Sequence, residues 1–255
     1  MKKYTVGLDL GGTKLAAALV DDKGQILSFH KESILDLKAD PRNGPRKIAA
    51  LMGDMVAAFK NRFPEAFQRK AFLGTGLASA GPLNVDKGIL IHPINFKGWK
   101  IIPIRELLEN ELKKHKIPNK VVFQNDAIAA ARAEAWIGGA RGLQSFAVVT
   151  IGTGIGSGVI FRGQPSQTNG MGSEFGHLIL QNREIRAPQD LKLNTVEGIA
   201  SGTGILRRAR ERGFQGQTVE ELLISLNGGD TQYQELFDDA ADALWSRYGG
   251  TDHQA

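Results

Sequence analysis

Two similar segments constrain the fold of this chain more than any other feature of its sequence. Each has an apolar run, a glycine-containing turn and a second apolar run, which is typical of a strand, a tight turn and a strand. The first segment spans Tyr4 to Val20 and the second spans Ser145 to Phe161, with corresponding glycines 141 residues apart. This weak internal repeat predicts two similar α/β domains, one over residues 1–140 and one over residues 141–255.

The residue types in the first turn suit a bound phosphate. Gly11 and Gly12 are expected to reach positive φ and to let a ligand approach the backbone. Successive N–H groups in such a turn bind anions, and Thr13 and Lys14 add donors. Asp9 precedes the glycines, where a carboxylate could face a phosphate-bound metal ion. Taken alone, an ordinary hairpin with an aspartate at the strand end explains this stretch equally well. Two such turns facing each other across a cleft could hold a polyphosphate.

Composition excludes several classes of site. The 255 residues include no cysteine, which excludes disulfides, thiolate metal sites and cysteine nucleophiles. The net charge is +5, but the basic residues are scattered, and the one tight run, Lys113 to Lys116, lies where a helix is expected to end. We therefore expect no nucleic-acid partner. No stretch is apolar enough to span a membrane, and charged residues interrupt the N-terminal apolar run, so we expect no membrane association and a cytoplasmic location.

Apolar periodicity predicts the remaining elements. The pattern indicates strands at Gln25–Ser33, Ala71–Leu77 and Val121–Phe123, and helices at Arg46–Phe63, Ile104–His115 and Ala127–Ile137. Residues 83–100 are expected to be irregular. The part of the chain after the second segment is expected to be mostly helical, with a capping box at Thr218 and Glu221, an amphipathic helix from Tyr233 to Tyr248 and a disordered end at Gly249 to Ala255.

The common nucleotide-binding folds can be compared with this pattern. The sequence has no GxxxxGK[ST], which excludes a P-loop. Gly11 and Gly12 are followed by a strand-like run and not by a helix, which argues against a Rossmann turn. A glycine hairpin at the N-terminus that is repeated in mid-chain fits the actin-like ATPase (ribonuclease H-like) fold better.

Six blocks in order make the resemblance specific. The chain resembles the ROK family (repressors, open reading frames and kinases), and in particular its glucokinase-like sugar kinases. The matching blocks are Asp9 to Lys14, Ala80-Gly81-Pro82 with Asn95 to Trp99, Asn125-Asp126-Ala127, Gly152 to Gly158, Glu174 to His177, and Glu197 with Ser201-Gly202. One Gly-Gly-Thr is weak evidence, but six blocks over about residues 4–205 are strong.

The resemblance implies transfer of a phosphoryl group from ATP to the primary hydroxyl of a glucose-like hexose, a reaction of carbohydrate metabolism and glycolysis. Asp126 would be the general base, although an aspartate there could also simply cap the next helix. The implied sugar-binding residues are Gly81, Asn95, Asn125, Asp126, Glu174, His177 and Glu197. The implied nucleotide-binding residues are Asp9, Gly11, Gly12, Thr13, Lys14, Gly152, Thr153 and Gly154, with Asp9 orienting Mg²⁺ through water.

Two departures from the family pattern affect these expectations. Many members hold a structural zinc with a histidine and three cysteines, whereas the matching region here, Gln181 to Thr195, has no cysteine, so we expect no zinc. The chain also stops before the family's C-terminal segment, and we expect a shortened second domain without its adenosine pocket. The exposed apolar surface could be covered in a homodimer. The alternative function is therefore a catalytically impaired sugar-binding protein. A DNA-binding repressor is not expected, because the chain begins directly at the first strand.

Overall fold

A computed structural model describes residues 1–166, 173–180 and 193–248 of the chain. Contacts divide the chain into two compact units, Met1–Ala147 with Gly158–Gly172, and Val148–Ser157 with Ser173–Ala255. The predicted boundary after residue 140 differs from this contact division, in which the described residues 141–147 and 158–166 group with the first unit. The domain boundary after residue 140 therefore stays a prediction.

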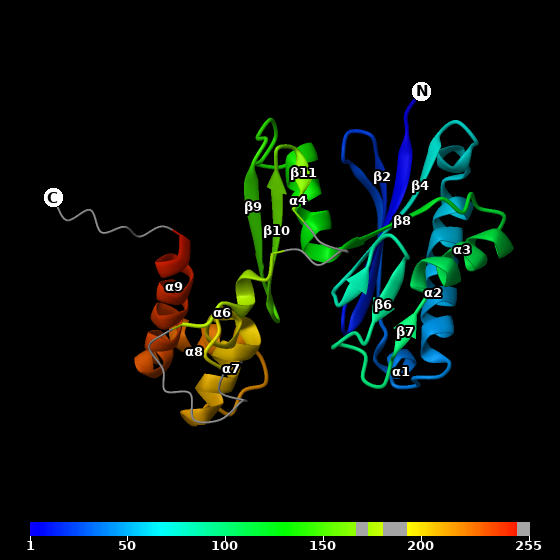
Figure 1. Ribbon diagram of the computed structural model, residues 1–255. Helices are drawn as coiled ribbons and strands as arrows, with labels where there is room; N and C mark the ends of the chain where they lie inside the picture. The colour runs from blue at the N-terminus through cyan, green and yellow to red at the C-terminus, as the bar shows by residue number, and fades with distance from the viewer. Residues whose placement is uncertain (167–172, 181–192, 249–255) are drawn as a thin grey trace. The chain divides into compact units, whose positions relative to one another are not determined.

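The first unit is built on a five-stranded sheet in the order β3-β2-β1-β4-β8 (Figure 1). β1, β4 and β8 are parallel, while β2 and β3 are antiparallel to their neighbours. The strands are β1 Tyr4–Leu10, β2 Lys14–Asp21, β3 Ile26–Ser33, β4 Phe72–Ser79 and β8 Val121–Asn125. The predicted strands at these places are confirmed.

Helices α2 Gly44–Arg62 and α3 Ile104–Lys114 cover one face of this sheet (Figure 1). The reason is the alternation in the strands: Val6, Leu8 and Leu10 are buried against the helices, whereas Gly7 and Asp9 point to the other face. The other helices of this unit are α1 Leu35–Lys38, η1 Pro64–Phe67 and α4 Asp126–Ile137.

The prediction that residues 83–100 are irregular is wrong in part. A small antiparallel sheet, β5-β6-β7, is formed by β5 Leu83–Asn84, β6 Ile89–Ile91 and β7 Ile101–Ile102. Strands of two or three residues are too short to show a clear alternation in the sequence, and Leu83 and Leu90 are buried through contacts with distant parts of the core.

The second repeat also forms two neighbouring strands, β9 Phe146–Ile151 and β10 Ile155–Phe161, with β11 Gln164–Pro165 beside β10. The rest of the second unit is helical in its described part, as predicted: η2 Phe175–His177, α6 Val196–Ala200, α7 Gly202–Glu211, α8 Val219–Asn227, η3 Thr231–Tyr233 and α9 Gln234–Tyr248. It has its own core, to which Val196, Ala209, Leu222 and Leu236 contribute. The predicted disorder of Gly249 to Ala255 concerns residues outside the described part.

Within the described residues, no helix is both long enough and apolar enough to cross a membrane.

Candidate functional site

The ends of three parallel strands bring most of the predicted N-terminal site residues to one edge of the sheet. Leu10 at the end of β1 is level with Ser79 at the end of β4, which is level with Asn125 at the end of β8. The buried Ser79 hydroxyl donates to the carbonyl oxygen of Leu10 at 3.3 Å and so ties two of these ends together. The first glycine turn, Gly81 and the Asn125-Asp126 pair each follow one of the strands. This is the edge at which α/β sheets bind ligands.

Asn125, and not Asp126, caps the helix that follows β8. The Asn125 Oδ1 accepts a hydrogen bond from Ile128 N at 3.2 Å, while Asp126 is the first residue of α4. The Asp126 carboxylate is exposed and accepts from the neighbouring Ala127 N at 2.8 Å. The simple alternative for Asp126, that it serves as the helix cap, is therefore wrong. Within the described part of the chain, its other carboxylate oxygen has no hydrogen-bond partner and can meet a ligand at the surface.

Asp9 lies near the end of β1 and Asp126 directly follows β8, so both lie at the same edge of the sheet. The cross-strand neighbours of Asp9 are Ala16 and Ala78, and Lys31 and Gln124 lie one strand further out on each side. Burial of its carboxyl group and the negative charge of Asp126 raise the pKa of Asp9, and the positive charge of Lys31 opposes the rise. A pair of carboxylates that repel each other at a strand end is a place where a cation or a positively charged group is favoured.

The first glycine turn contacts the loop that carries Asn95. A Cβ atom on Gly12 would lie 3.0 Å from Asn95 Cγ, so a side chain at position 12 would require the Asn95 side chain to shift. Neither Gly11 nor Gly12 adopts a positive φ, and this part of the prediction is wrong. The close approach of the Asn95 side chain leaves little room for a Cβ atom at position 12. Thr13 and Lys14 are exposed at the turn.

Two buried aromatic side chains support the loop that carries Asn95. Phe96 and Trp99 are buried, and their ring centroids lie 4.5 Å apart. Asn95 itself stays exposed at the tip of the loop. Gly81 is half-buried after β4, in a cis peptide bond with Pro82.

In the second unit, the glycine turn between β9 and β10 packs on the start of α7. The carbonyl oxygens of Gly152 and Thr153 accept hydrogen bonds from Gly202 N at 2.8 Å and Thr203 N at 3.3 Å. The buried Ser201 caps α7 by accepting from Gly204 N at 3.0 Å. The turn is therefore fixed to the N-terminus of α7, whose first N–H groups donate to the turn and to Ser201.

Glu197 holds the same turn from the other side. Its Oε2 accepts from Ile155 N at 2.9 Å, and a Cβ atom on Gly154 would lie only 2.6 Å from that oxygen. Glu197 is thus joined to the second glycine turn, a link that the sequence did not predict. Its predicted sugar contact stays a prediction.

Glu174, which directly precedes η2, and His177, the last residue of η2, lie beside each other. The His177 Nε2 is 3.5 Å from Glu174 Oε2, and about half of each side chain is exposed. Between them, Gly176 is buried against β10, where a Cβ atom would lie 2.4 Å from the Ile155 carbonyl oxygen. Gly176 lets this segment pack closely on β10, while the side chains of Glu174 and His177 remain accessible. Most of the region that corresponds to the family's zinc cluster lies outside the described residues.

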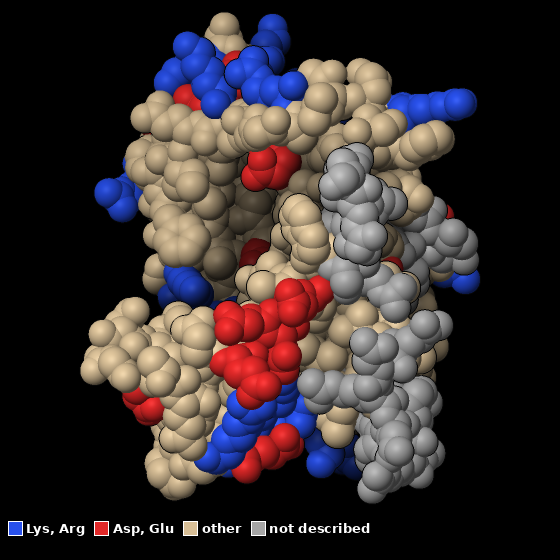
Figure 2. Space-filling view, turned by 90° about the vertical axis from the view of Figure 1, so that its left-hand side faces the viewer, with Lys and Arg blue, Asp and Glu red and all other residues tan. Residues whose placement is uncertain are grey.

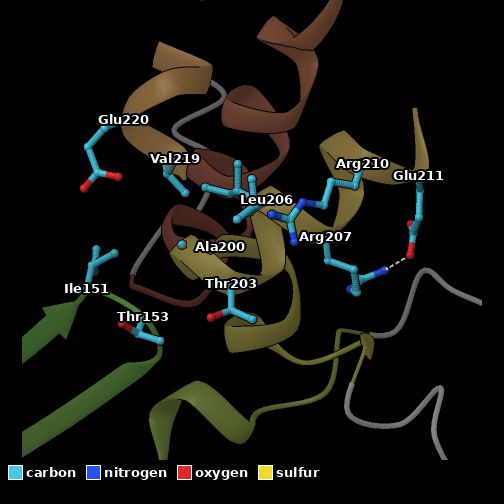
Figure 3. A pocket seen from close by; sticks show the side chains of 13 residues that line it. Ile151, Thr153, Ala200, Thr203, Leu206, Arg207, Arg210, Glu211, Val219 and Glu220 are labelled. Atoms are coloured by element: carbon cyan, nitrogen blue, oxygen red, sulfur yellow. Dashed lines mark hydrogen bonds and ion pairs between the residues drawn. The ribbon is translucent and has the colours of Figure 1, made fainter. Parts of the chain in front are cut away.

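A cavity of about 890 Å³ opens beside the second glycine turn. Figure 3 shows Ile151 and Thr153 on one side, Thr203, Leu206, Arg207 and Arg210 from α7, and Val219 and Glu220 from α8. Arg207 pairs with Glu211 at 2.6 Å, and Arg210 donates to Gln217 Oε1 at 2.9 Å. The cavity places a hollow next to the predicted phosphate turn of the second unit. The expected absence of an adenosine pocket stays a prediction.

The sequence did not single out Lys38, Arg207 or Arg210. Arg207 and Arg210 lie in a region predicted only to be mostly helical, and Lys38 is part of none of the six matching blocks. Figure 2 shows acidic side chains lying directly against basic ones on one face of the molecule, which fits the interpretation that the positive net charge is not gathered into one binding surface there.

Comparison with known proteins supports the expected fold. The model of the ROK family matches residues 5–245. A glucokinase from Halalkalibacterium halodurans is 32% identical over 247 residues, which cover 95% of this chain and 70% of that protein. The crystal structure of a ROK hexokinase from Thermus thermophilus has a TM-score of 0.70 at 32% identity and covers 96% of this chain and 75% of its own.

A ROK glucokinase from Streptomyces griseus, solved in complex with glucose and AMPPNP, has a TM-score of 0.69 at 25% identity and covers 94% of this chain and 76% of its own. These similarities confirm the actin-like ATPase fold. They also support the expected enzyme class, sugar kinase, at the level of the family. With a family match over almost its whole length, the chain belongs to the ROK family.

Proposed function

We propose that this chain phosphorylates the primary hydroxyl of a glucose-like hexose with ATP, with Asp126 as the general base. The observation that carries the proposal is the division of roles between adjacent residues at the end of β8. Because Asn125 caps α4, the Asp126 carboxylate is exposed, and its hydrogen bond to the helix N-terminus uses one oxygen, which accepts from Ala127 N. A carboxylate at this sheet edge can accept the proton of the sugar hydroxyl while the hydroxyl oxygen attacks the γ-phosphorus and ADP leaves.

Seven residues are the proposed sugar ligands. Gly81, Asn95, Asn125 and Asp126 belong to the first unit, and Glu174, His177 and Glu197 belong to the second. Amide, carboxylate and imidazole groups suit a sugar, because each hydroxyl needs a polar partner for discrimination. The Asn125 Oδ1 is used by the helix cap, so its Nδ2 is the group free to donate to a sugar oxygen.

The proposed nucleotide ligands are the two glycine turns, with Thr13, Lys14 and Thr153 adding donors. The cavity beside Gly152 and Thr153 supports a nucleoside site, since it begins at the phosphate turn and is lined by α7 and α8. The Asp9 carboxylate fits Mg²⁺, because it offers hard oxygen ligands at this sheet edge. Burial of the Asp9 carboxyl group and the negative charge of Asp126 raise the pKa of Asp9, and a nearby cation would oppose that rise. Asp9 would hold the ion through water, and the ion would neutralise charge on the transferred phosphoryl group. We expect no zinc.

ADP release with ATP–Mg²⁺ and a panel of hexoses and N-acetylhexosamines tests the proposal. We expect turnover with at least one sugar, and a fall in kcat of about 10²–10⁴-fold in Asp126→Asn, the range for loss of a general base. The matched control is Asp22→Asn, a change of an exposed aspartate in the turn after β2, which should keep full activity. An Asp126→Asn enzyme as active as the wild type would overturn the base assignment.

Thermal unfolding of the same samples separates the alternative function. A sugar that raises Tm while no sugar supports ADP release would favour the catalytically impaired sugar-binding protein. Robust ADP release would rule it out. Because ATP and hexoses are small molecules of the cytoplasm, a cytoplasmic location is part of the proposal. We also propose that the protein has no nucleic-acid partner. A homodimer is proposed as well, and light scattering would check it.

A further inference from the structure

We propose that Lys38 is a positioning residue that ties the first glycine turn to the loop that carries Asn95. The proposal rests on the function proposed above, and it assigns a role to a residue outside all six matching sequence blocks. In that function the turn would hold phosphate and the loop would hold the sugar. A residue that fixes one against the other would set the alignment of the two substrates within the first unit.

The contacts of the Lys38 ammonium carry this inference. Its Nζ donates to the carbonyl oxygen of Gly12 in the turn and, at 3.2 Å, to the carbonyl oxygen of Asn95 in the loop. The side chain comes from α1, a third segment that is part of neither. The turn and the loop also touch directly, since a Cβ atom on Gly12 would lie 3.0 Å from Asn95 Cγ. Lys38 thus holds together two backbone segments that are already in contact.

The charge of Lys38 strengthens the case. The residue is half-buried, and within the described part of the chain no carboxylate forms an ion pair with its ammonium. Partial burial of an unpaired charge costs free energy, which hydrogen bonds from the charged group to two carbonyl oxygens offset. A phosphate at the adjacent turn would supply the missing negative charge. The chemistry at this point therefore suits an anionic ligand and a fixed geometry together.

Substitution of Lys38 has a matched control elsewhere in the same unit. Lys60 Nζ also donates to two carbonyl oxygens, those of His115 at 2.9 Å and Lys116 at 3.0 Å, at the end of α3. Lys60→Met removes a lysine that bridges two carbonyls without touching any proposed site residue. Lys38→Met removes the same kind of bridge at the turn. Lys38→Arg keeps the charge and several donors.

Steady-state kinetics give the first measurement. In Lys38→Met we expect the KM for sugar to rise about 10-fold or more, the size of effect expected when charge-assisted hydrogen bonds are lost, and kcat to fall. Lys38→Arg should lie between the wild type and Lys38→Met. Lys60→Met should lower Tm without changing the sugar KM, because a purely structural bridge does not alter the site of molecules that remain folded. A wild-type sugar KM and kcat in Lys38→Met would overturn the proposal.

Hydrogen exchange gives a second measurement that does not depend on turnover. The reporters are the amides of Ile34, which bonds to Thr13 O, and Phe96, which bonds to Pro93 O. Both amides should exchange faster in Lys38→Met than in the wild type. Their exchange rates should be unchanged in Lys60→Met. If the wild type releases no ADP with any sugar, the proposed function fails, while faster exchange at both amides would still support the bridge. Unchanged exchange at both would overturn the bridge whatever the activity.

Discussion

At the scale of single residues, the roles of Asn125 and Asp126 could not be separated from the sequence. Both residue types favour helix N-termini, so either could have been the cap. The structure decides between them through one hydrogen bond, from Ile128 N to Asn125 Oδ1. In the same way, Gly12 was explained from the sequence by the positive φ that glycine allows. The structure instead shows the side chain of Asn95, 83 residues away in the sequence, lying close to position 12.

Asp9 gives a prediction of pH dependence at this scale. Its pKa is raised above the ordinary value of 3.8 by burial and by Asp126. Between the ordinary and the raised pKa the folded state binds more protons than the unfolded state, so the free energy of unfolding falls as pH rises through this window. Asp9→Asn removes the ionised carboxylate. We therefore expect a higher Tm than the wild type at pH 7, a difference that disappears as pH falls below 3.8, and reduced kinase activity.

Thermal unfolding of Asp9→Asn from pH 3.5 to 8 without nucleotide checks this expectation, with Asp22→Asn as the control that should follow the wild type. A Tm for Asp9→Asn equal to or below that of the wild type at pH 7 would show that the Asp9 carboxylate is not destabilising in the folded protein.

At the scale of elements, the two glycine hairpins were predicted correctly, because each combines an apolar alternation with turn residues over a short stretch. The position of η2 was not predictable in this way. The segment from Glu174 to His177 is placed by Gly176, which packs on the backbone of β10. That contact joins parts of the chain about 20 residues apart and leaves no periodic signal.

Gly176→Ala tests this packing. With a Cβ atom 2.4 Å from the Ile155 carbonyl oxygen, η2 must shift, and we expect a loss of about 1–3 kcal/mol in the free energy of unfolding together with a higher sugar KM. Gly7→Ala is the control, because a Cβ atom there meets nothing within 4 Å. Urea unfolding and steady-state kinetics measure both effects. A Gly176→Ala enzyme with wild-type stability and sugar KM would show that η2 does not depend on the close contact.

At the scale of the whole molecule, the described residues form two separate hydrophobic cores, one under the five-stranded sheet and one among α6, α7, α8 and α9. Leu236 is fully buried in the second core. Leu236→Ala should cost about 2–5 kcal/mol, the range for truncating a buried leucine. The exposed Leu223 of α8 provides the control, and Leu223→Ala should change stability by less than about 0.5 kcal/mol.

Hydrogen exchange locates the effect of Leu236→Ala. Because the cores are separate, faster exchange is expected in α6 to α9, while the amides of β1 and β4 keep their protection. An equal loss of protection in both units would mean that the two cores unfold as one cooperative structure.

The sequence by itself determined the elements with strong local signals, the nature of the chemistry-bearing residues and the resemblance to the ROK family. Alternation, helical periodicity and glycine turns act over a few residues, so they can be recognised without the fold. Tertiary structure decided which residues meet: the level strand ends of Leu10, Ser79 and Asn125, the link between Glu197 and the second glycine turn, and the bridge from Lys38 to Gly12 and Asn95. These contacts join segments far apart in the chain, and they depend on strand order and packing, which no local pattern encodes.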